Sequence, residues 1–106
     1  MSPNYSGPTP LYIGVGRITL RMAENASLKD KRQVVRSVVQ RVRNQFGIAI
    51  AEVGALDRWS VAELGLSCVS NDARHAEEVM AKALQFIEEL RPDAEVVDTS
   101  VVVERF

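Results

Sequence analysis

The chain has 106 residues, of which 46% are hydrophobic and 25% charged, and its formal net charge at pH 7 is −1. This length suffices for one packed domain, and a charge near zero excludes a protein that attracts polyanions over its whole surface. The single cysteine, Cys68, excludes an intramolecular disulfide and suits a reducing compartment. No apolar run is long enough to span a membrane and no secretion signal is visible, so we expect a cytoplasmic protein without membrane contact.

The first ten residues, MSPNYSGPTP, combine three prolines with a glycine and two serines. Such a composition cannot bury apolar surface and predicts a flexible tail over residues 1–10. A single domain is expected to fill residues 11–106. Its first segment, residues 11–22, alternates between apolar and polar side chains, as a strand with one buried face does.

The next segment, SLKDKRQVVRSVVQRVRNQF, predicts an amphipathic helix over residues 27–46. Ser27 suits the N-cap, and Asp30 three residues later forms a shortened capping box with it. Gly47 suits the left-handed residue that ends a helix. The apolar face is expected to contain Leu28, Val35, Val38, Val39, Val42 and Phe46.

The second half of the chain contains the same kinds of strand and helix signals. Residues 48–53 and 59–69 predict two strands of a hairpin, and residues 70–72 offer N-caps for a second helix that ends near Leu90, before Pro92. A Val-rich strand over residues 95–104 closes the order βαββαβ. This order predicts an α+β ferredoxin-like sandwich, with two helices on one face of a four-stranded antiparallel sheet.

The first predicted helix contains six Lys or Arg residues and a single acid, Asp30. Lys29, Arg32, Arg36 and Arg43 follow one stripe beside the apolar face, and Lys31 belongs to the same basic block. Such a cluster favours phosphates or carboxylates as partners. The alternative is a solvated helix face with no partner. We expect Lys29, Lys31, Arg32, Arg36 and Arg43 to be the nucleic-acid-binding residues if the stripe is functional.

Other candidate motifs have simpler explanations. Gly14 and Gly16 form a GxG without the turn and helix that a dinucleotide site requires, so they are expected to allow close packing. The third strand lacks the aromatic residues with which RNA recognition domains stack bases, and Trp59 is expected to be a packing anchor or subunit contact. His75 has no second metal ligand at suitable spacing. We therefore expect no metal, no cofactor and no small-molecule substrate.

No catalytic residues are expected either. Cys68 has the parity of a core residue and no base is paired with it in the sequence. Glu52 and Glu63 could face each other across the hairpin, but two isolated solvated carboxylates are the simpler explanation.

Taken together, the segments IGVGRITLRM, SLKDKRQVVRSVVQRVRNQF, IAEV and DRWSVAELGLSCVSND, with the FIEEL and VVD ending, resemble the YlxP-like family of small bacterial proteins. The resemblance covers about residues 11–103. It implies a ferredoxin-like fold, no established activity and genes beside those of translation initiation and ribosome maturation factors. It transfers no catalytic residue to this chain, and Gly54, Ala55 and Leu56 differ from the more polar hairpin of many members.

Three functions remain open from the sequence. The leading hypothesis is a non-enzymatic accessory protein that binds RNA or a ribosomal surface through the basic helix. The alternative is a protein-interaction or regulatory module that forms a homodimer or larger oligomer through its open sheet face, with no nucleic-acid role. An acylphosphatase-type enzyme comes third, because residues 23–27 lack the glycines and arginine that would hold a phosphate.

Overall fold

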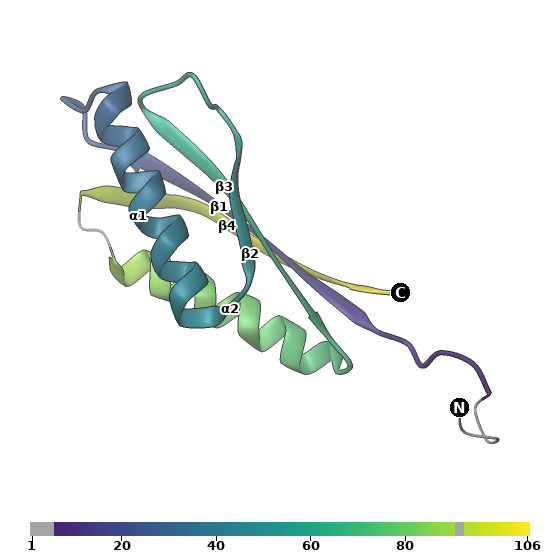
Figure 1. Cartoon of the computed structure of the whole chain (residues 1–106). Coiled ribbons are helices and arrows are strands. Elements are labelled where there is room, and N and C mark those ends of the chain that lie inside the picture. The colour runs from purple at the N-terminus through teal and green to yellow at the C-terminus, as the bar shows by residue number, and fades with distance from the viewer. Residues whose placement is uncertain (1–5, 91–92) are drawn as a thin grey trace.

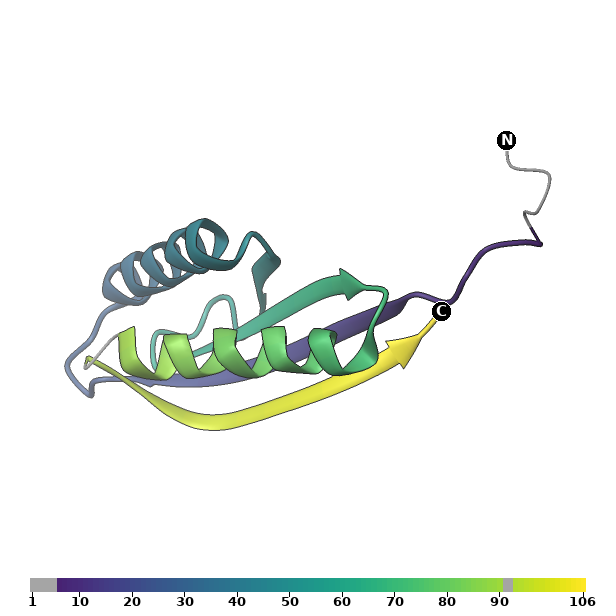
Figure 2. The same ribbon diagram turned by 90° about the horizontal axis from the view of Figure 1, so that it is seen from below.

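The structure, a computed structural model, describes residues 6–90 and 93–106. Its elements are β1 (Tyr12–Met22), α1 (Leu28–Phe46), β2 (Ala49–Gly54), β3 (Val61–Ser70), α2 (Ala73–Leu90) and β4 (Ala94–Arg105). The strands form one antiparallel sheet in the order β2-β3-β1-β4. Figures 1 and 2 show both helices on the same face of this sheet. The predicted βαββαβ ferredoxin-like sandwich is thus confirmed.

Local signals at the ends of α1 act as predicted. The Ser27 hydroxyl accepts a hydrogen bond from the Asp30 backbone N–H at 3.1 Å, and the Ser27 N–H donates to Asp30 Oδ2 at 2.8 Å. Gly47 adopts the left-handed conformation with φ 63° and donates to the Arg43 carbonyl. The helix therefore begins and ends where the capping residues require. At α2, Asp72 Oδ1 accepts from the N–H groups of Arg74 and His75.

Two predictions concern residues 1–10 and Pro92. The first part of the expected tail, residues 1–5, lies outside the described residues, as does Pro92, the expected stop of α2. The next residues pair before β1 begins: the Leu11 and Phe106 backbones exchange two hydrogen bonds of 3.0 and 2.8 Å. Backbone pairing between β1 and β4 therefore extends by one residue pair at the end where Tyr12 lies opposite Arg105.

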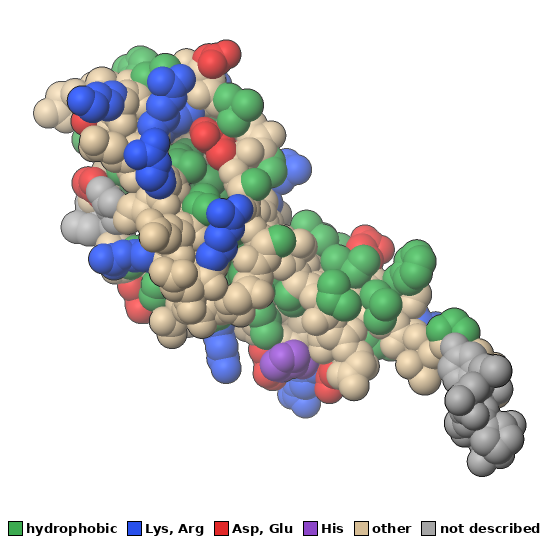
Figure 3. All heavy atoms as spheres, viewed as in Figure 1, with side chains coloured by type: hydrophobic (Ala, Val, Ile, Leu, Met, Phe, Trp, Pro, Cys, Tyr) green, Lys and Arg blue, Asp and Glu red, His purple; other side chains and the backbone are tan. Residues whose placement is uncertain are grey.

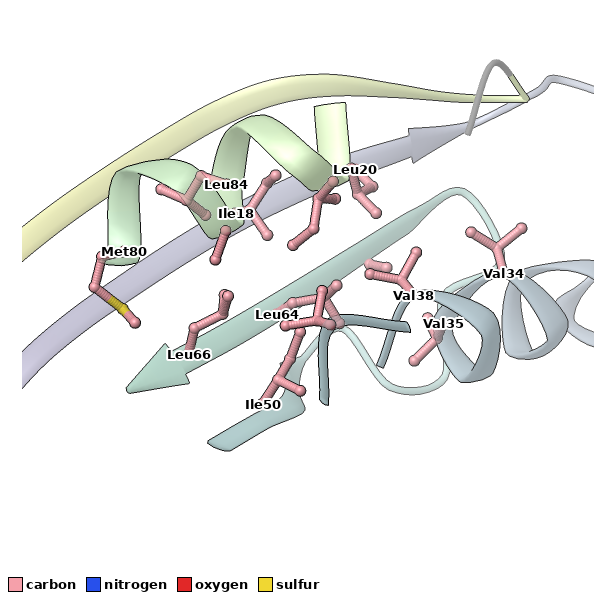
Figure 4. Packing of buried hydrophobic residues seen from close by; sticks show 14 of the residues in the cluster. Ile18, Leu20, Val34, Val35, Val38, Ile50, Leu64, Leu66, Met80 and Leu84 are labelled. Atoms are coloured by element: carbon pink, nitrogen blue, oxygen red, sulfur yellow. The ribbon is translucent and has the colours of Figure 1, made fainter. Parts of the chain in front are cut away.

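The core lies between the helices and the inner face of the sheet. Figure 4 shows Ile18 and Leu20 of β1, with Leu64 of β3, pointing toward the side chains of both helices. From α1 the core receives Val34, Val35, Val38 and Val42, and from α2 it receives Ala76, Met80, Ala83, Leu84 and Ile87. The prediction that the apolar faces of both helices pack on the sheet is confirmed. Val34 is buried although it was not expected, and three expected members of the α1 face are only half-buried, namely Leu28, Val39 and Phe46.

Gly14 lets α2 approach the sheet closely. A Cβ at this position would lie 3.0 Å from each of three atoms, the Ala76 carbonyl oxygen, Cys68 Sγ and Met80 Cγ. Any larger side chain would have to push the helix backbone away from β1. The close-packing role expected for the glycine pair is thus confirmed at Gly14.

Neither α1 nor α2 covers the opposite face of the sheet (Figure 2). Ile13, Val15 and Arg17 of β1 point to this open face, because their neighbours Gly14 and Gly16 point to α2. Val15 is 43% exposed and Val69 of β3 is 71% exposed. The sheet therefore presents apolar side chains to solvent at the end where β1 and β3 extend past α1 (Figure 1).

Candidate nucleic-acid interface on helix α1

Five of the six basic side chains of α1 form a basic band on its solvent side. Lys29, Arg32, Arg36, Arg41 and Arg43 are all exposed, and Figure 3 shows Lys and Arg side chains gathered over this helix. The amphipathic pattern produces this arrangement, because the valines of α1 occupy the opposite side and face the sheet. Four of the five residues expected to bind nucleic acid therefore lie together on one surface.

Three of these arginines line one groove. The groove runs between α1 and β2, has a volume of about 600 Å³ and is lined by Arg32, Arg36 and Arg43 together with Val35, Val39 and Glu52. An axial rise of about 1.5 Å per residue places Arg32 and Arg43 roughly 16 Å apart along the helix axis. The groove thus combines a row of guanidinium groups with an apolar lining and one carboxylate, that of Glu52, which is paired with Lys31.

These guanidinium groups are available for an anion. Within residues 6–90 and 93–106, none of Arg32, Arg36 and Arg43 forms an ion pair with a carboxylate. Arg43 Nη2 donates to the Ile50 carbonyl of β2 at 3.1 Å, which holds this side chain across the end of the groove. A guanidinium has five N–H donors, so Arg43 keeps donors for a ligand.

The single acid of α1 does not neutralise the groove. Asp30 lies in the first turn, where its carboxylate accepts the Ser27 N–H. This backbone hydrogen bond, with the Ser27 hydroxyl contact and nearby Lys29, holds the pKa of Asp30 below its ordinary value. Asp30 is therefore charged at neutral pH, but its carboxylate is bound to the N-terminus of α1.

The expectation that Lys31 contacts nucleic acid is wrong. Its side chain is fully buried, and Nζ lies 2.8 Å from the Ala55 carbonyl, 3.2 Å from those of Leu56 and Val61, and 2.9 Å from Glu52 Oε2. These four oxygens satisfy the ammonium and join α1 to the β2–β3 loop. Lys31 is thus a structural residue and cannot reach a nucleic acid.

Glu52 is the partner of Lys31, and the hypothetical carboxylate pair across the hairpin does not form. In the β2–β3 register Glu52 faces Leu64, while Glu63 lies opposite Gly54. The two carboxylates therefore have different neighbours. The Lys31 ammonium is the one partner of Glu52 Oε2 among the described residues.

The remaining singled-out residues do not form a second polar site. Cys68 is half-buried and its Sγ lies 3.6 Å from the Ala76 carbonyl, while His75 is exposed at the start of α2. Trp59 is 44% exposed on the β2–β3 loop, so it is not the packing anchor that was one of its two expected roles. In the described part of the chain, no three His, Cys, Asp or Glu side chains are grouped as a metal site requires.

Helix α2 has the opposite charge. The two helices meet through Phe46 and Phe86, whose rings contact edge to face with centroids 5.5 Å apart. Among the described residues no ion pair joins α1 to α2, so the basic band is not neutralised through direct pairing with its neighbour. The exposed acidic residues of α2 are Glu77, Glu78, Glu88 and Glu89.

The fold and this surface define a small ferredoxin-like protein with an arginine-lined groove on one helix. No helix among the described residues is long and apolar enough to cross a membrane. The chain belongs to the family described as protein of unknown function (DUF503), whose model matches residues 13–101. The resemblance seen in the sequence segments is thereby confirmed.

Individual relatives are also known. The chain is 32% identical over 76 residues to the uncharacterized protein YlxP of Bacillus subtilis (strain 168), across 72% of this chain and 83% of that protein. It is similar to a solved structure from Shewanella oneidensis at 12% identity, covering 88% of this chain and 90% of the other with a TM-score of 0.47. A dimeric protein of unknown function and ferredoxin-like fold from Bacteroides fragilis NCTC 9343 is similar at 10% identity, covering 88% and 96% with a TM-score of 0.46. Likenesses at this level say nothing of assembly or function.

Proposed function

We propose that this protein is a non-enzymatic accessory protein of the cytoplasm that binds RNA through the groove face of α1. The observation behind this proposal is the row formed by Arg32, Arg36 and Arg43, which line one groove and have no carboxylate partner among the described residues. Unpaired arginines on a rigid helix are suited to phosphate oxygens, because the guanidinium donates two parallel hydrogen bonds to them.

The shape of the groove favours a chain of phosphates over a single anion. Its arginines extend over roughly 16 Å at about 1.5 Å per residue, which is longer than one phosphate group. The apolar contribution of Val35 and Val39 can pack against sugars or base edges between the phosphate contacts. The translation context implied by the family resemblance makes RNA the natural polyanion. Holding a backbone in this way requires no catalytic side chain.

A charge-neutral variant of the groove tests the proposal. Arg32→Gln combined with Arg36→Gln removes two cations while leaving the Arg43 contact with β2 intact. Affinity for a fluorescently labelled single-stranded RNA is measured by anisotropy over a range of salt concentrations. Since each phosphate contact contributes about 0.7 to the logarithmic salt slope for single strands, the slope should flatten by about 1.4.

The matched control removes the same number of positive charges from α2. Arg74→Gln combined with Lys82→Gln removes two exposed cations from α2 and should leave the slope at the wild-type value. Circular dichroism confirms that both variants are folded. Equal affinity and equal slope for the wild type and both variants would show that the groove does not bind RNA and that the basic band is a solvated face.

A further inference from the structure

The open face of the sheet contains one contiguous apolar patch, formed by Ile13, Val15, Val69 and Val102 and called here the open-face patch. Strand register makes it contiguous: Ile13 lies opposite Val69 of β3, and Val15 lies opposite Val102 of β4. Three of its members are 43%, 71% and 53% exposed, namely Val15, Val69 and Val102. An exposed apolar cluster on a sheet face marks an interaction surface.

Two opposite charges flank this patch. Glu104 of β4 is the register partner of Ile13, so it lies at one end, and Arg17 follows Val15 by two residues on the same face, so it lies at the other. Both side chains are exposed, and neither forms an ion pair among the described residues. By contrast, Arg21 and Glu95 on the same face form an ion pair with each other at 2.7 Å.

We propose that a second copy of this chain covers the open-face patch. The two-fold axis lies between the two sheets, at right angles to the strands. It follows the row that Val15 forms with its register partners Ser67 and Val102, called here the Val15 row. Such an axis reverses the strand direction, so the Val15 row of one copy packs on that of the other. The same rotation brings the end that holds Glu104 over the end that holds Arg17. Each copy then supplies both members of a reciprocal pair, as isologous contacts require.

The charges exclude the other simple arrangement. A two-fold axis parallel to the strands of β1 would place each end of the patch over the same end of the patch in the other copy. Glu104 of one copy would then lie against Val69 of the other. A carboxylate would then be desolvated without a cation, which is strongly unfavourable. Only the perpendicular axis covers the apolar side chains and compensates both charges. Sheets stacked about 10 Å apart leave long Arg and Glu side chains within reach of each other.

This assembly is compatible with the RNA-binding groove but independent of it. Both helices lie on the face of the sheet opposite the patch (Figure 2), so α1 remains exposed on each copy. Loss of RNA binding by the groove variant would leave the dimer intact, and disruption of the dimer would leave the arginines of each copy in place. The two proposals can thus fail separately.

The mass of the full chain in solution provides the first test. Light scattering coupled to size exclusion should give twice the 11.7 kDa of one chain at micromolar concentration. Val15→Lys places two like charges face to face at the axis and should give the single-chain mass. The control Leu56→Lys changes another exposed apolar residue outside the patch and should remain dimeric.

Charge reversal tests the arrangement at exposed positions where folding is not at risk. Arg17→Glu alone and Glu104→Arg alone should each raise the dimer dissociation constant by about tenfold or more, because like charges then face each other. The double reversal should restore the dissociation constant to near the wild-type value. A monomeric wild-type protein, a dimer that survives Val15→Lys, or single reversals that the double variant does not rescue would overturn the proposal.

Discussion

Replacing Lys31 with methionine removes an ammonium group that four oxygens surround. Three of them are the carbonyls of Ala55, Leu56 and Val61, at 2.8, 3.2 and 3.2 Å, and the fourth is Glu52 Oε2 at 2.9 Å. The methionine would fill similar volume but offer no donor. The Glu52 side chain, only 18% exposed, would then hold a charge without a partner among the described residues.

The expected cost is large for a domain of this size. Breaking a buried ion pair by removing one partner costs about 3–5 kcal/mol of unfolding free energy. An unfolding entropy of about 2.1 cal/mol/K per residue amounts to about 0.22 kcal/mol/K for 106 residues, so the Tm should fall by about 14–22 °C. This loss is a substantial share of the total stability, which is about 5–15 kcal/mol for typical domains.

Chemical denaturation followed by circular dichroism measures the effect. The matched control is Lys29→Met, which makes the same change two residues earlier at an exposed position and should alter stability by no more than about 0.5 kcal/mol. Adding Glu52→Gln to Lys31→Met removes the unpaired carboxylate and should recover part of the loss. If Lys31→Met unfolds at the same denaturant concentration as Lys29→Met, the Lys31 ammonium is not buried between α1 and the loop.

Two further substitutions test the packing and the capping of the helices. Gly14→Ala should destabilise the fold by about 1–3 kcal/mol through overpacking, because its Cβ would lie 3.0 Å from the Ala76 carbonyl, whereas Gly16→Ala, whose nearest contact is 3.4 Å, should cost less in the same urea titration. For Asp30, the folded pKa is below the unfolded one, so its stabilising effect is complete at neutral pH and is lost as the pH falls through the lowered pKa. The stability difference between the wild type and Asp30→Asn should therefore shrink in acid, and a difference that is constant with pH would contradict the capping role.

The order and approximate bounds of the elements followed from local patterns. Helix α1 begins after Ser27 and ends before Gly47 because capping depends on nearby backbone groups and on one residue's φ. The strands could be recognised from period-two alternation, and the βαββαβ order then left one common way to bury both apolar helix faces. These features depend on short-range physics, which is why a single sequence was sufficient for them.

The open-face patch depended on register. Alternation within β1 and β3 places Ile13, Val15, Val61 and Val69 on the side away from the core, and Val15 and Val69 are exposed in the structure. Val102 joins them only because β4 pairs beside β1, with Val102 opposite Val15. Pairing partners distant in the chain leave no mark in either strand's own alternation.

Lys31 shows most clearly where local reasoning ends. It precedes Val34, Val35, Val38 and Val42 at spacings that place all five on one helix face, so its position on the buried side could have been noticed. A buried lysine is nonetheless unfavourable unless acceptors surround it. Those acceptors come from Glu52 of β2, from the loop carbonyls of Ala55 and Leu56, and from the carbonyl of Val61 at the start of β3, which lie 24, 25 and 30 residues after Lys31. Burial of Lys31 is therefore decided by where the residues around the β2–β3 loop pack against α1, because an ammonium leaves water only where folding supplies oxygens in its place.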